Sequence, residues 1–251
     1  MIIKPPISRL GGKSRLKETI ISMLPEHDCY VEVSAGAAWV YFSKDPSAVE
    51  VVNDKDEELI NLFKVLKYHE KELERLLNYE FSARDSFERY KQDKRFKENM
   101  TDIQRAVRFL YLISQSFASR GNTYGYAPSK IPSQKIFQES FKEVHERLKN
   151  TYVENLDFET VIEKYDREYT VFFCDPPYID VTGYEVEFKK DDHVRLAETL
   201  HRAKGKFLLT INDHPLSRQL YHNYRIKEVE TMYSASKTSN KKVKELIITN
   251  Y

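Results

Sequence analysis

Two short apolar runs near the N-terminus, each followed by a stretch with helical spacing, constrain the fold of this chain most. Residues 30–33 and 49–52 are rich in β-branched residues and are predicted to be strands. Residues 36–42 between them favour a short helix that begins with small residues. After the second run, the pair Asn53-Asp54 is a helix N-cap signal, and apolar residues within 59–66 recur at helical spacing. This alternation of strand and helix predicts the opening of a parallel α/β sheet.

The α/β pattern stops near residue 67 and resumes near residue 151. The second part again alternates apolar runs with amphipathic stretches. We therefore expect one α/β sheet domain built from residues 1–67 and 151–251. The elements predicted in its second part are strands over 170–174, 206–211 and 245–249, and helices over 191–203 and 215–221.

Residues 68–150, between the two parts, form a segment of different character. They are charged, lack a convincing series of strands, and show helical spacing over 103–117 and 137–150. Within 84–135 there are eleven Lys and Arg against five Asp and Glu, an excess of six positive charges in a chain whose net charge is +1. Such a segment is the expected footprint of phosphate binding. A solvated helical face is the alternative explanation of the same charges.

The composition is typical of a protein that folds in a reducing aqueous compartment. The 251 residues are 41% hydrophobic, which suffices for a sizeable core. No apolar run approaches the roughly 18 to 20 residues that a membrane span needs. The N-terminus lacks the apolar stretch of a signal peptide, so we expect a cytoplasmic protein. Cys29 and Cys174 are then expected to be free, buried thiols, and no Cys and His residues have the spacing of a zinc site, so no metal is expected.

The tetrad Asp175-Pro176-Pro177-Tyr178 directly follows the apolar strand predicted over 170–174. Ligands of open α/β sheets bind outside the carboxyl ends of the strands. Two prolines fix φ and supply no N–H donors, so their carbonyls and the Asp175 carboxylate are acceptors in a rigid turn. Acceptors beside the flat ring of Tyr178 suit a planar base that carries an amino group. Asp and Pro also form ordinary turns at strand ends, which is the alternative interpretation.

Two further segments place small residues where a ligand could approach the backbone. Gly11-Gly12-Lys13 precedes a helix-like run but lacks the spacing of a phosphate-binding loop, and alone it fits an ordinary turn better. Glu32 to Ala38 ends a strand in small residues, and Asp54 follows the next strand about twenty residues later, as in dinucleotide-binding folds. The segment has a single glycine and is not the full dinucleotide fingerprint, and a helix cap is the alternative role for Asp54.

In their order along the chain, these segments resemble the Dam-type (D12 class) DNA N6-adenine methyltransferases, especially phage and prophage members. The similarity covers almost the whole chain. The tetrad also occurs in other amino-methyltransferases, so the combination and order of the motifs make the match specific. The matching segments are Gly11-Gly12-Lys13, Glu32 to Ala38, Asn53-Asp54 with Glu58-Leu59-Ile60-Asn61, Asn155-Leu156-Asp157-Phe158, the tetrad, and Lys244 to Tyr251.

The resemblance implies a Rossmann-like methyltransferase sheet domain with an inserted helical target-recognition domain over residues 68–150. It implies S-adenosyl-L-methionine as cofactor and double-stranded DNA as substrate, and it admits a cognate restriction endonuclease as partner. We expect a monomer. The residues expected around the cofactor are Gly11, Gly12, Lys13, Glu32, Ser34, Gly36, Asp54, Asp157 and Asp175, and the expected catalytic residues are Asp175, Pro176, Pro177 and Tyr178.

A loop in the basic segment, residues 118–128, mixes Arg, Asn and Tyr with glycines and follows an amphipathic helix that can hold it. We expect it to contact DNA. Arg120 is the candidate for a bidentate contact with guanine, and a contact with phosphate alone is the alternative. The residues expected to bind DNA are Arg120, Asn122, Tyr124 and Lys130.

The loop from Ser34 to Ala38 departs from the family pattern. The family usually has Phe where Ser34 stands and more glycine where Ala35, Ala37 and Ala38 stand. This departure makes a catalytically degenerate, DNA-binding homologue one alternative. Methylation of cytosine N4 or of an RNA adenine is another. Asp at the first tetrad position favours adenine and the basic segment favours DNA, so the predicted function is site-specific methylation of adenine N6 on a base flipped out of duplex DNA.

Overall fold

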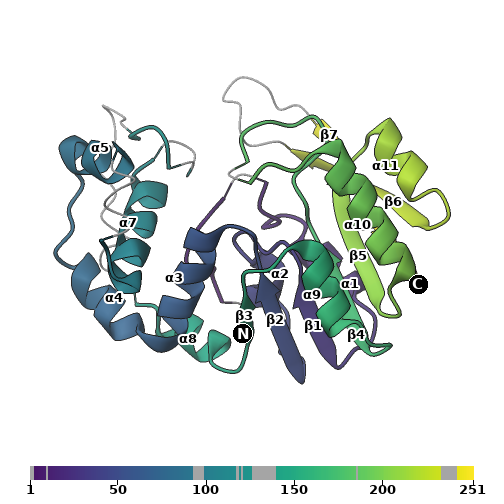
Figure 1. The fold of residues 1–251 in the computed structure, drawn as a ribbon, viewed down its shortest axis with the longest axis horizontal. Helices are drawn as coiled ribbons and strands as arrows, with labels where there is room; N and C mark the ends of the chain where they lie inside the picture. Colours follow the sequence, from purple (N-terminus) through teal and green to yellow (C-terminus); the bar gives the residue numbers. More distant parts are fainter. Residues whose placement is uncertain are drawn as a thin grey trace.

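The computed structural model has an α/β fold with a seven-stranded sheet at its centre (Figure 1). The structure describes residues 3–9, 11–92, 99–116, 119, 121–125, 140–184, 186–232 and 242–251. The strands are β1 (Cys29–Glu32), β2 (Val49–Asn53), β3 (Tyr152–Glu154), β4 (Thr170–Cys174), β5 (Lys206–Asn212), β6 (Arg225–Met232) and β7 (Lys242–Thr249).

The strands lie in the order β3-β2-β1-β4-β5-β7-β6. Strands β1 to β5 are parallel to one another, whereas β7 runs antiparallel between β5 and β6. The chain winds outward in one direction from β1 to β3 and in the other from β4 to β5. The order therefore reverses between β1 and β4, and in open α/β sheets the crevice at such a reversal is where ligands bind.

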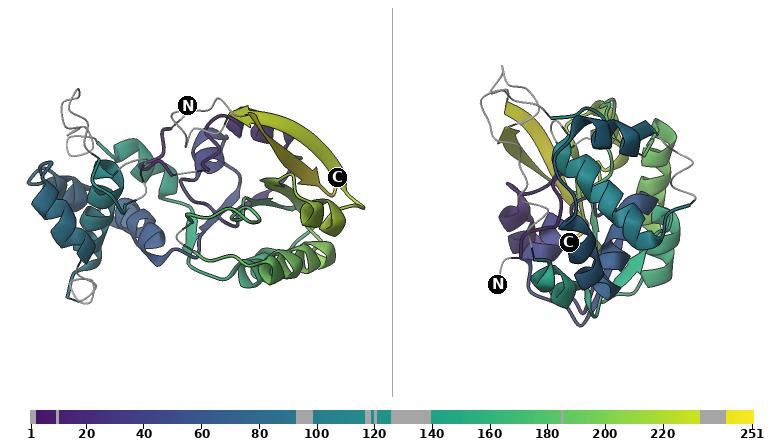
Figure 2. Two further views of the ribbon diagram at one scale, coloured as in Figure 1. Left: turned by 90° about the horizontal axis from the view of Figure 1, so that it is seen from above. Right: turned by 90° about the vertical axis from the view of Figure 1, so that its left-hand side faces the viewer.

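Helices cover both faces of the sheet (Figure 2). Because side chains alternate across a strand, Tyr30 faces one hydrophobic core and Val31 the other. The helices that contribute to the first core include α1 (Lys17–Met23) and α2 (Trp39–Ser43), and those that contribute to the second include α9 (Phe158–Tyr165), α10 (Lys190–Arg202) and α11 (Pro215–Leu220). None of the helices in the described part of the chain is long and apolar enough to cross a membrane.

A group of helices between β2 and β3 lies beside the sheet, at the left of Figure 1. They are α3 (Glu57–Tyr68), α4 (Glu70–Leu77), α5 (Arg84–Gln92), α7 (Asp102–Gln115) and α8 (Lys142–Leu148). Helix α3 packs against both α7 and α8. The first hydrophobic core continues from Val52 of β2 through Leu62 of α3 to Tyr111 of α7, so these helices share their core with one face of the sheet.

A buried ion cluster joins the last of these helices to the sheet. The guanidinium of Arg147 in α8 pairs with Glu50 of β2, which also accepts from Lys44 Nζ at 2.6 Å. Arg147 lies 4.0 Å over the ring of Tyr41, and its carbonyl accepts from the Tyr41 hydroxyl at 2.7 Å. Tyr41 belongs to α2, directly after the loop from Ser34 to Ala38. The cluster therefore fixes α8 against the element that follows the predicted cofactor loop.

Most predicted elements are present, and β3, β6 and α9 are among those that were not predicted. Strand β3 is only three residues long, too short for a periodic pattern, and β6 is an edge strand in which four of the first six residues are charged. Helix α9 was not predicted either. The predicted cap of α3 was wrong: Asp56, not the pair Asn53-Asp54, accepts from the backbone N–H groups of Glu58 and Leu59. Asn53 is instead the last residue of β2.

The predicted short helix over 36–42 begins later, at Trp39. Gly36 and Ala38 both have left-handed backbones, with φ of 50° and 56°, which a right-handed helix excludes. The prediction for the two cysteines is confirmed, since Cys29 and Cys174 are both free and buried.

Candidate active site

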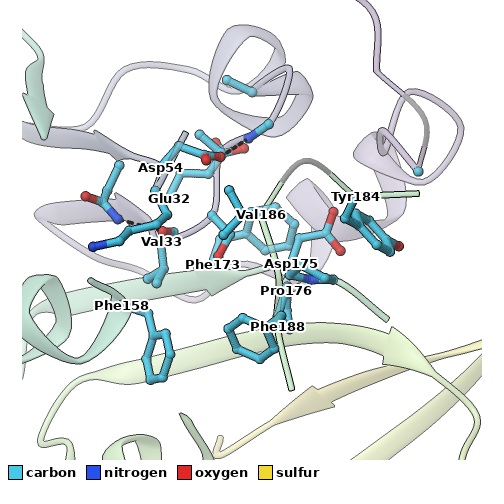
Figure 3. Close-up of a pocket in the computed structure, with 18 of the residues that line it drawn as sticks. Glu32, Val33, Asp54, Phe158, Phe173, Asp175, Pro176, Tyr184, Val186 and Phe188 are labelled. Carbon is cyan, nitrogen blue, oxygen red and sulfur yellow. Dashed lines mark hydrogen bonds between the residues drawn. The ribbon is translucent and has the colours of Figure 1, made fainter. Parts of the chain in front are cut away.

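A pocket lies at the carboxyl ends of β1, β2 and β4, where the strand order reverses. Every predicted catalytic and cofactor residue lines it, although these residues span Gly11 to Tyr178 in the sequence. Figure 3 shows Glu32 and Asp54 toward one end of this pocket, and Asp175, Pro176 and Tyr184 toward the other. The lining residues that were not predicted include Arg9, Trp39, Asn53, Phe158, Tyr184, Phe188 and Arg195.

The loop between β1 and α2 is closed by Asp54 of the neighbouring strand end. Asp54 Oδ2 accepts from the backbone N–H of Gly36 at 2.8 Å, and Oδ1 accepts from that of Asp56 at 2.9 Å. A Cβ at Gly36 would have no atom within 4 Å, so this backbone faces open space. Burial raises the pKa of Asp54, and the positive charge of Arg9 opposes this. The carboxylate therefore holds the loop and, with two oxygens, retains acceptor capacity for a ligand.

Glu32 is the last residue of β1 and is only 2% exposed. Its Oε2 accepts from the Tyr30 hydroxyl at 3.1 Å and from the backbone N–H of Tyr41 at 3.0 Å. Burial raises the pKa of Glu32 to about 8, because removal from water disfavours the charged form more than these two donors favour it. A cation placed in the pocket would stabilise the ionised carboxylate.

The loops after β1 and β3 are joined by Asn53. Its side-chain amide donates to the carbonyl of Val33 at 2.8 Å and accepts from the backbone N–H of Leu156 at 2.8 Å. This brings the segment Leu156-Asp157-Phe158 to the rim of the pocket. The polar residue at the end of β2 thus explains why residues about a hundred positions apart line one site.

Asp157 caps α9 and is held by an arginine that the sequence did not indicate. Its Oδ1 accepts from the backbone N–H of Glu159 at 3.1 Å. The guanidinium of Arg195 in α10 donates to both Asp157 oxygens at 3.1 Å each, so the two side chains form a bidentate pair. Arg195 also lies 4.3 Å over the ring of Phe158. The result is a polar and aromatic wall at the outer edge of the pocket.

The Asp175 carboxylate is the polar centre of the tetrad. Its Oδ1 lies 2.7 Å from Lys13 Nζ and accepts from the Thr210 hydroxyl at 2.8 Å. Burial raises the pKa of Asp175, and Lys13 and Thr210 oppose this by stabilising the carboxylate. Lys13 also donates to the carbonyl of Gly11 at 3.0 Å. The N-terminal Gly-Gly-Lys segment therefore contacts the tetrad through its lysine.

Tyr178, the last residue of the tetrad, is 7% exposed. The ammonium of Lys13 lies 5.0 Å from the centre of its ring. Burial raises the pKa of Tyr178 well above its ordinary value, and the negative charges of Asp175 and Glu245 add to this. The hydroxyl is therefore neutral, and the ring lies within the pocket lining.

Of the four residues predicted to bind DNA, the structure describes two. Asn122 is exposed. Tyr124 packs against Phe87 with ring centroids 5.5 Å apart, lies 4.9 Å from the guanidinium of Arg84, and its hydroxyl is 2.9 Å from that of Ser82. Tyr124 thus braces the helical segment. The other two, Arg120 and Lys130, lie outside the described residues.

The fold and the pocket define a Rossmann-like α/β protein with a ligand-sized pocket at the switch point of its sheet. The family model described as D12 class N6 adenine-specific DNA methyltransferase matches residues 10–235. The chain therefore belongs to this family, and it is an adenine-specific DNA methyltransferase.

Relatives named as DNA methyltransferases match most of this chain. The type II methyltransferase M1.LlaDCHI of Lactococcus lactis subsp. cremoris is 28% identical over 277 residues, which cover 99% of this chain and 96% of the relative. The DNA N-6-adenine-methyltransferase of Escherichia phage P1 is 30% identical over 250 residues, covering 92% of this chain and 32% of the relative. The DNA adenine methylase of Escherichia coli strain K12 is 25% identical over 267 residues, covering 94% and 91%.

Proposed function

We propose that the pocket holds S-adenosylmethionine and a flipped-out adenine, with Asp175 to Tyr178 between them. Use of S-adenosylmethionine is implied by the family, and the donor set of the pocket fits it. Asp54 supplies carboxylate oxygens for the ribose hydroxyls of the cofactor, and Phe158 and Phe188 supply apolar surface for the adenine ring of the cofactor. Buried Glu32 suits a cationic ligand. When bound, this molecule supplies an electrophilic methyl group on a positively charged sulfur.

The small residues of the pocket also fit a ligand that packs against the backbone. A Cβ at Gly12 would lie 3.1 Å from the ring of Trp39, so a side chain there would push into the pocket wall. Gly36, with φ of 50°, keeps an N–H bonded to Asp54 while its Cα faces open space. The remaining residues assigned to the cofactor are Gly11, Lys13, Ser34 and Asp157, all of which line the same pocket.

Asp175 is proposed to activate the target amino group. The nitrogen lone pair of adenine N6 is conjugated into the ring, which makes it a poor nucleophile. Hydrogen bonds from the two amino hydrogens to the Asp175 carboxylate and the Pro176 carbonyl favour a pyramidal nitrogen whose lone pair is free to attack. The carboxylate also stabilises the positive charge that develops on nitrogen, so the site acts by alignment and electrostatics. Pro177 keeps the turn rigid, and Tyr178 offers its ring to the base.

The helical segment 68–150 is proposed to recognise duplex DNA. The excess of positive charge within 84–135 supports this, because phosphate contacts supply most of the affinity for DNA. A base within the duplex cannot reach a pocket at the sheet, so the target adenine must be flipped out at a cost of a few kcal/mol. Arg120, Asn122 and Lys130 are the proposed contacts, and Tyr124 is proposed to support them from within the segment.

A role in restriction and modification is proposed from the relatives. Two of them are named type II methyltransferases, from Lactococcus lactis subsp. cremoris and from Paramecium bursaria Chlorella virus NC1A. A cognate endonuclease would be the partner. DNA methylated by this chain should then resist the endonuclease of the same host, whereas DNA incubated with the Asp175→Asn variant should be cut.

The observation that carries the catalytic proposal is that Asp175, Glu32 and Asp54 line one pocket at the strand switch point. Asp175→Asn should abolish methylation of adenine N6, measured by mass spectrometry of nucleosides from DNA incubated with protein and cofactor. Calorimetry should show that the variant still binds DNA. Asp213 is a partly buried carboxylate that pairs with Arg218 outside the pocket, so Asp213→Asn serves as the control and should keep its rate. Near-normal turnover by a folded Asp175→Asn protein would remove Asp175 from the mechanism.

A further inference from the structure

Strand β5 carries two polar side chains at its carboxyl end, Thr210 and Asn212. They are two residues apart, so they project from the same face of the strand. Strand β5 pairs in parallel with β4, which leads directly into the tetrad. Thr210 is completely buried, and a polar side chain in such a place requires a hydrogen-bond partner. Both residues find their partners in the segment from Asp175 to Ile179.

Thr210 holds the beginning of this segment. Its hydroxyl donates to Asp175 Oδ1 at 2.8 Å and lies 3.5 Å from the carbonyl of Cys174. Lys13 Nζ approaches the same oxygen at 2.7 Å. Two donors on Oδ1 fix the rotation of the carboxylate. Oδ2 is then the oxygen that we assign to the target amino group.

Asn212 holds the end of the segment. Its Oδ1 accepts from the backbone N–H of Ile179 at 3.0 Å, and its Nδ2 donates to the carbonyl of the same residue at 3.0 Å. Ile179 directly follows Tyr178 and is 3% exposed. The segment that follows it supplies Tyr184 and Phe188 to the pocket wall. A paired amide contact of this kind fixes both the position and the orientation of the backbone at Ile179.

We propose that Thr210 and Asn212 are positioning residues for methyl transfer, which clamp the tetrad at its two ends and orient the Asp175 carboxylate toward the target amino group. The proposal rests on the catalytic role proposed for Asp175. It assigns no contact with DNA or cofactor to either residue. Their effect should therefore appear in the methyl-transfer step and not in binding.

A change in the Thr210 hydroxyl should also alter the pH dependence. The titratable or charged groups that act on Asp175 are Lys13, Glu32, Cys174, Tyr178 and Glu245. Burial raises the pKa of Asp175, and the hydroxyl of Thr210 is one of the donors that lower it. Loss of the hydroxyl raises this pKa further. Because the ionised carboxylate is the active form, the acid limb of the rate profile should move to higher pH.

The test compares three variants in single-turnover methyl transfer at saturating S-adenosylmethionine and duplex DNA. Thr210→Val keeps the shape of the side chain and removes the donor, and Thr210→Ser keeps the donor. Thr170→Val is the matched control, because Thr170 is an equally buried threonine of β4 whose hydroxyl donates to the carbonyl of Tyr165 at 2.8 Å. Loss of a hydrogen bond to a carboxylate predicts a rate lower by roughly tenfold to a hundredfold in Thr210→Val. Thr210→Ser and Thr170→Val should stay within about threefold of the unmodified protein, on the same scale of hydrogen-bond energies.

The second end of the clamp has its own matched control. Asn250 makes a similar pair of backbone contacts at the opposite end of β5, where it accepts from the backbone N–H of Phe207 at 2.8 Å and donates to the carbonyl of Gly205 at 3.1 Å. Asn212→Ala should slow methyl transfer, with dissociation constants for cofactor and DNA unchanged within about twofold, a difference below 0.5 kcal/mol. Asn250→Ala should leave the rate near that of the unmodified protein. The comparison of Asn212→Ala with Asn250→Ala tests the proposal independently of Thr210, so it still applies if Thr210→Val does not fold.

The outcomes separate this inference from the proposed function. Slow transfer with an acid limb at higher pH in Thr210→Val, and normal behaviour of Thr210→Ser, supports the clamp. Equal rates and equal pH profiles for Thr210→Val and Thr170→Val, or equal rates for Asn212→Ala and Asn250→Ala, overturn it. If Asp175→Asn is inactive while these variants are normal, the clamp fails and the proposed function stands. If Asp175→Asn is active, both fail.

Discussion

Replacement of Glu32 by Gln should remove the pH dependence that this buried carboxyl imposes on stability. Glu32 lies at the end of β1, 2% exposed, and its pKa is raised to about 8, chiefly by burial. Its ordinary value is near 4.5. Between these two values the folded protein keeps the proton that the unfolded chain has lost. Stability in the absence of cofactor should therefore fall as pH rises through this range and become flat above about pH 8.

The size of the effect follows from the two pKa values. Each pH unit in the window costs ~1.36 kcal/mol, so the rise from about pH 6 to about pH 9 should cost the unmodified protein roughly 3 kcal/mol through this group. Gln keeps an oxygen that can accept from the Tyr30 hydroxyl and the backbone of Tyr41, and it has no proton to lose. The difference in unfolding free energy, Glu32→Gln minus unmodified protein, should thus be roughly 3 kcal/mol more positive at about pH 9 than at about pH 6.

Urea unfolding of both proteins at about pH 6 and about pH 9, without cofactor, measures this difference. Glu154→Gln is the control. The pKa of Glu154 is lowered despite partial burial, because Lys164 and Tyr165 donate to it, so its ionisation contributes only at acidic pH. Its difference from the unmodified protein should be the same at both pH values. A Glu32→Gln difference that changes by less than about 0.5 kcal/mol between them would refute the assignment of a raised pKa to Glu32.

Three further predictions concern the cofactor loop and DNA recognition. Asp54→Ala should weaken S-adenosylmethionine binding about tenfold or more, measured by calorimetry, and leave DNA affinity unchanged, because a charge-assisted hydrogen bond is worth roughly 1.5 to 3 kcal/mol. Equal cofactor affinity of the variant and the unmodified protein would mean that Asp54 only accepts from Gly36 and does not bind the cofactor. Ala38→Gly should raise the free energy of unfolding by about 0.5 to 1 kcal/mol, because Ala38 has φ of 56°, whereas Ala37→Gly, at a position without positive φ, should lower it. Arg120→Ala should relax the sequence preference at one position of the target site, because we expect Arg120 to contact guanine. Methylation profiling on a randomised DNA library measures this, and an unaltered preference would mean that Arg120 contacts only phosphate.

The departure of the Ser34 to Ala38 loop from the family pattern has a physical counterpart in the structure. Ala38 occupies a left-handed conformation in which an L-residue costs about 1 to 2 kcal/mol and glycine costs little. The loop nevertheless keeps its anchors, because Ala35 N–H donates to the carbonyl of Asn53 at 2.9 Å and Gly36 N–H donates to Asp54. The strain is carried by the backbone of Ala38, and the pocket lining is retained.

The sequence by itself determined the class of fold, the family and the residues of the tetrad. Strand and helix periodicity is a local property, so 170–174, 206–211 and the start of the α/β pattern could be predicted without tertiary information. The motifs carry their residue types and order in the chain. Their assignment to one pocket followed from the rule that the carboxyl ends of parallel strands meet at one edge of the sheet.

Only the tertiary structure decided which of these side chains are bonded to one another. The cap of α3 is Asp56 and not Asp54, because Asp54 turns toward Gly36 across the strand boundary. Lys13 pairs with a carboxylate 162 positions away, by the numbering of the two residues, and Thr210 reaches the same oxygen from the neighbouring strand. No periodic pattern contains such pairs, because they depend on strand order and register, and these follow from burial of both faces of the sheet. The raised pKa of Glu32 has the same origin, since burial is a property of the packed molecule and not of the residue.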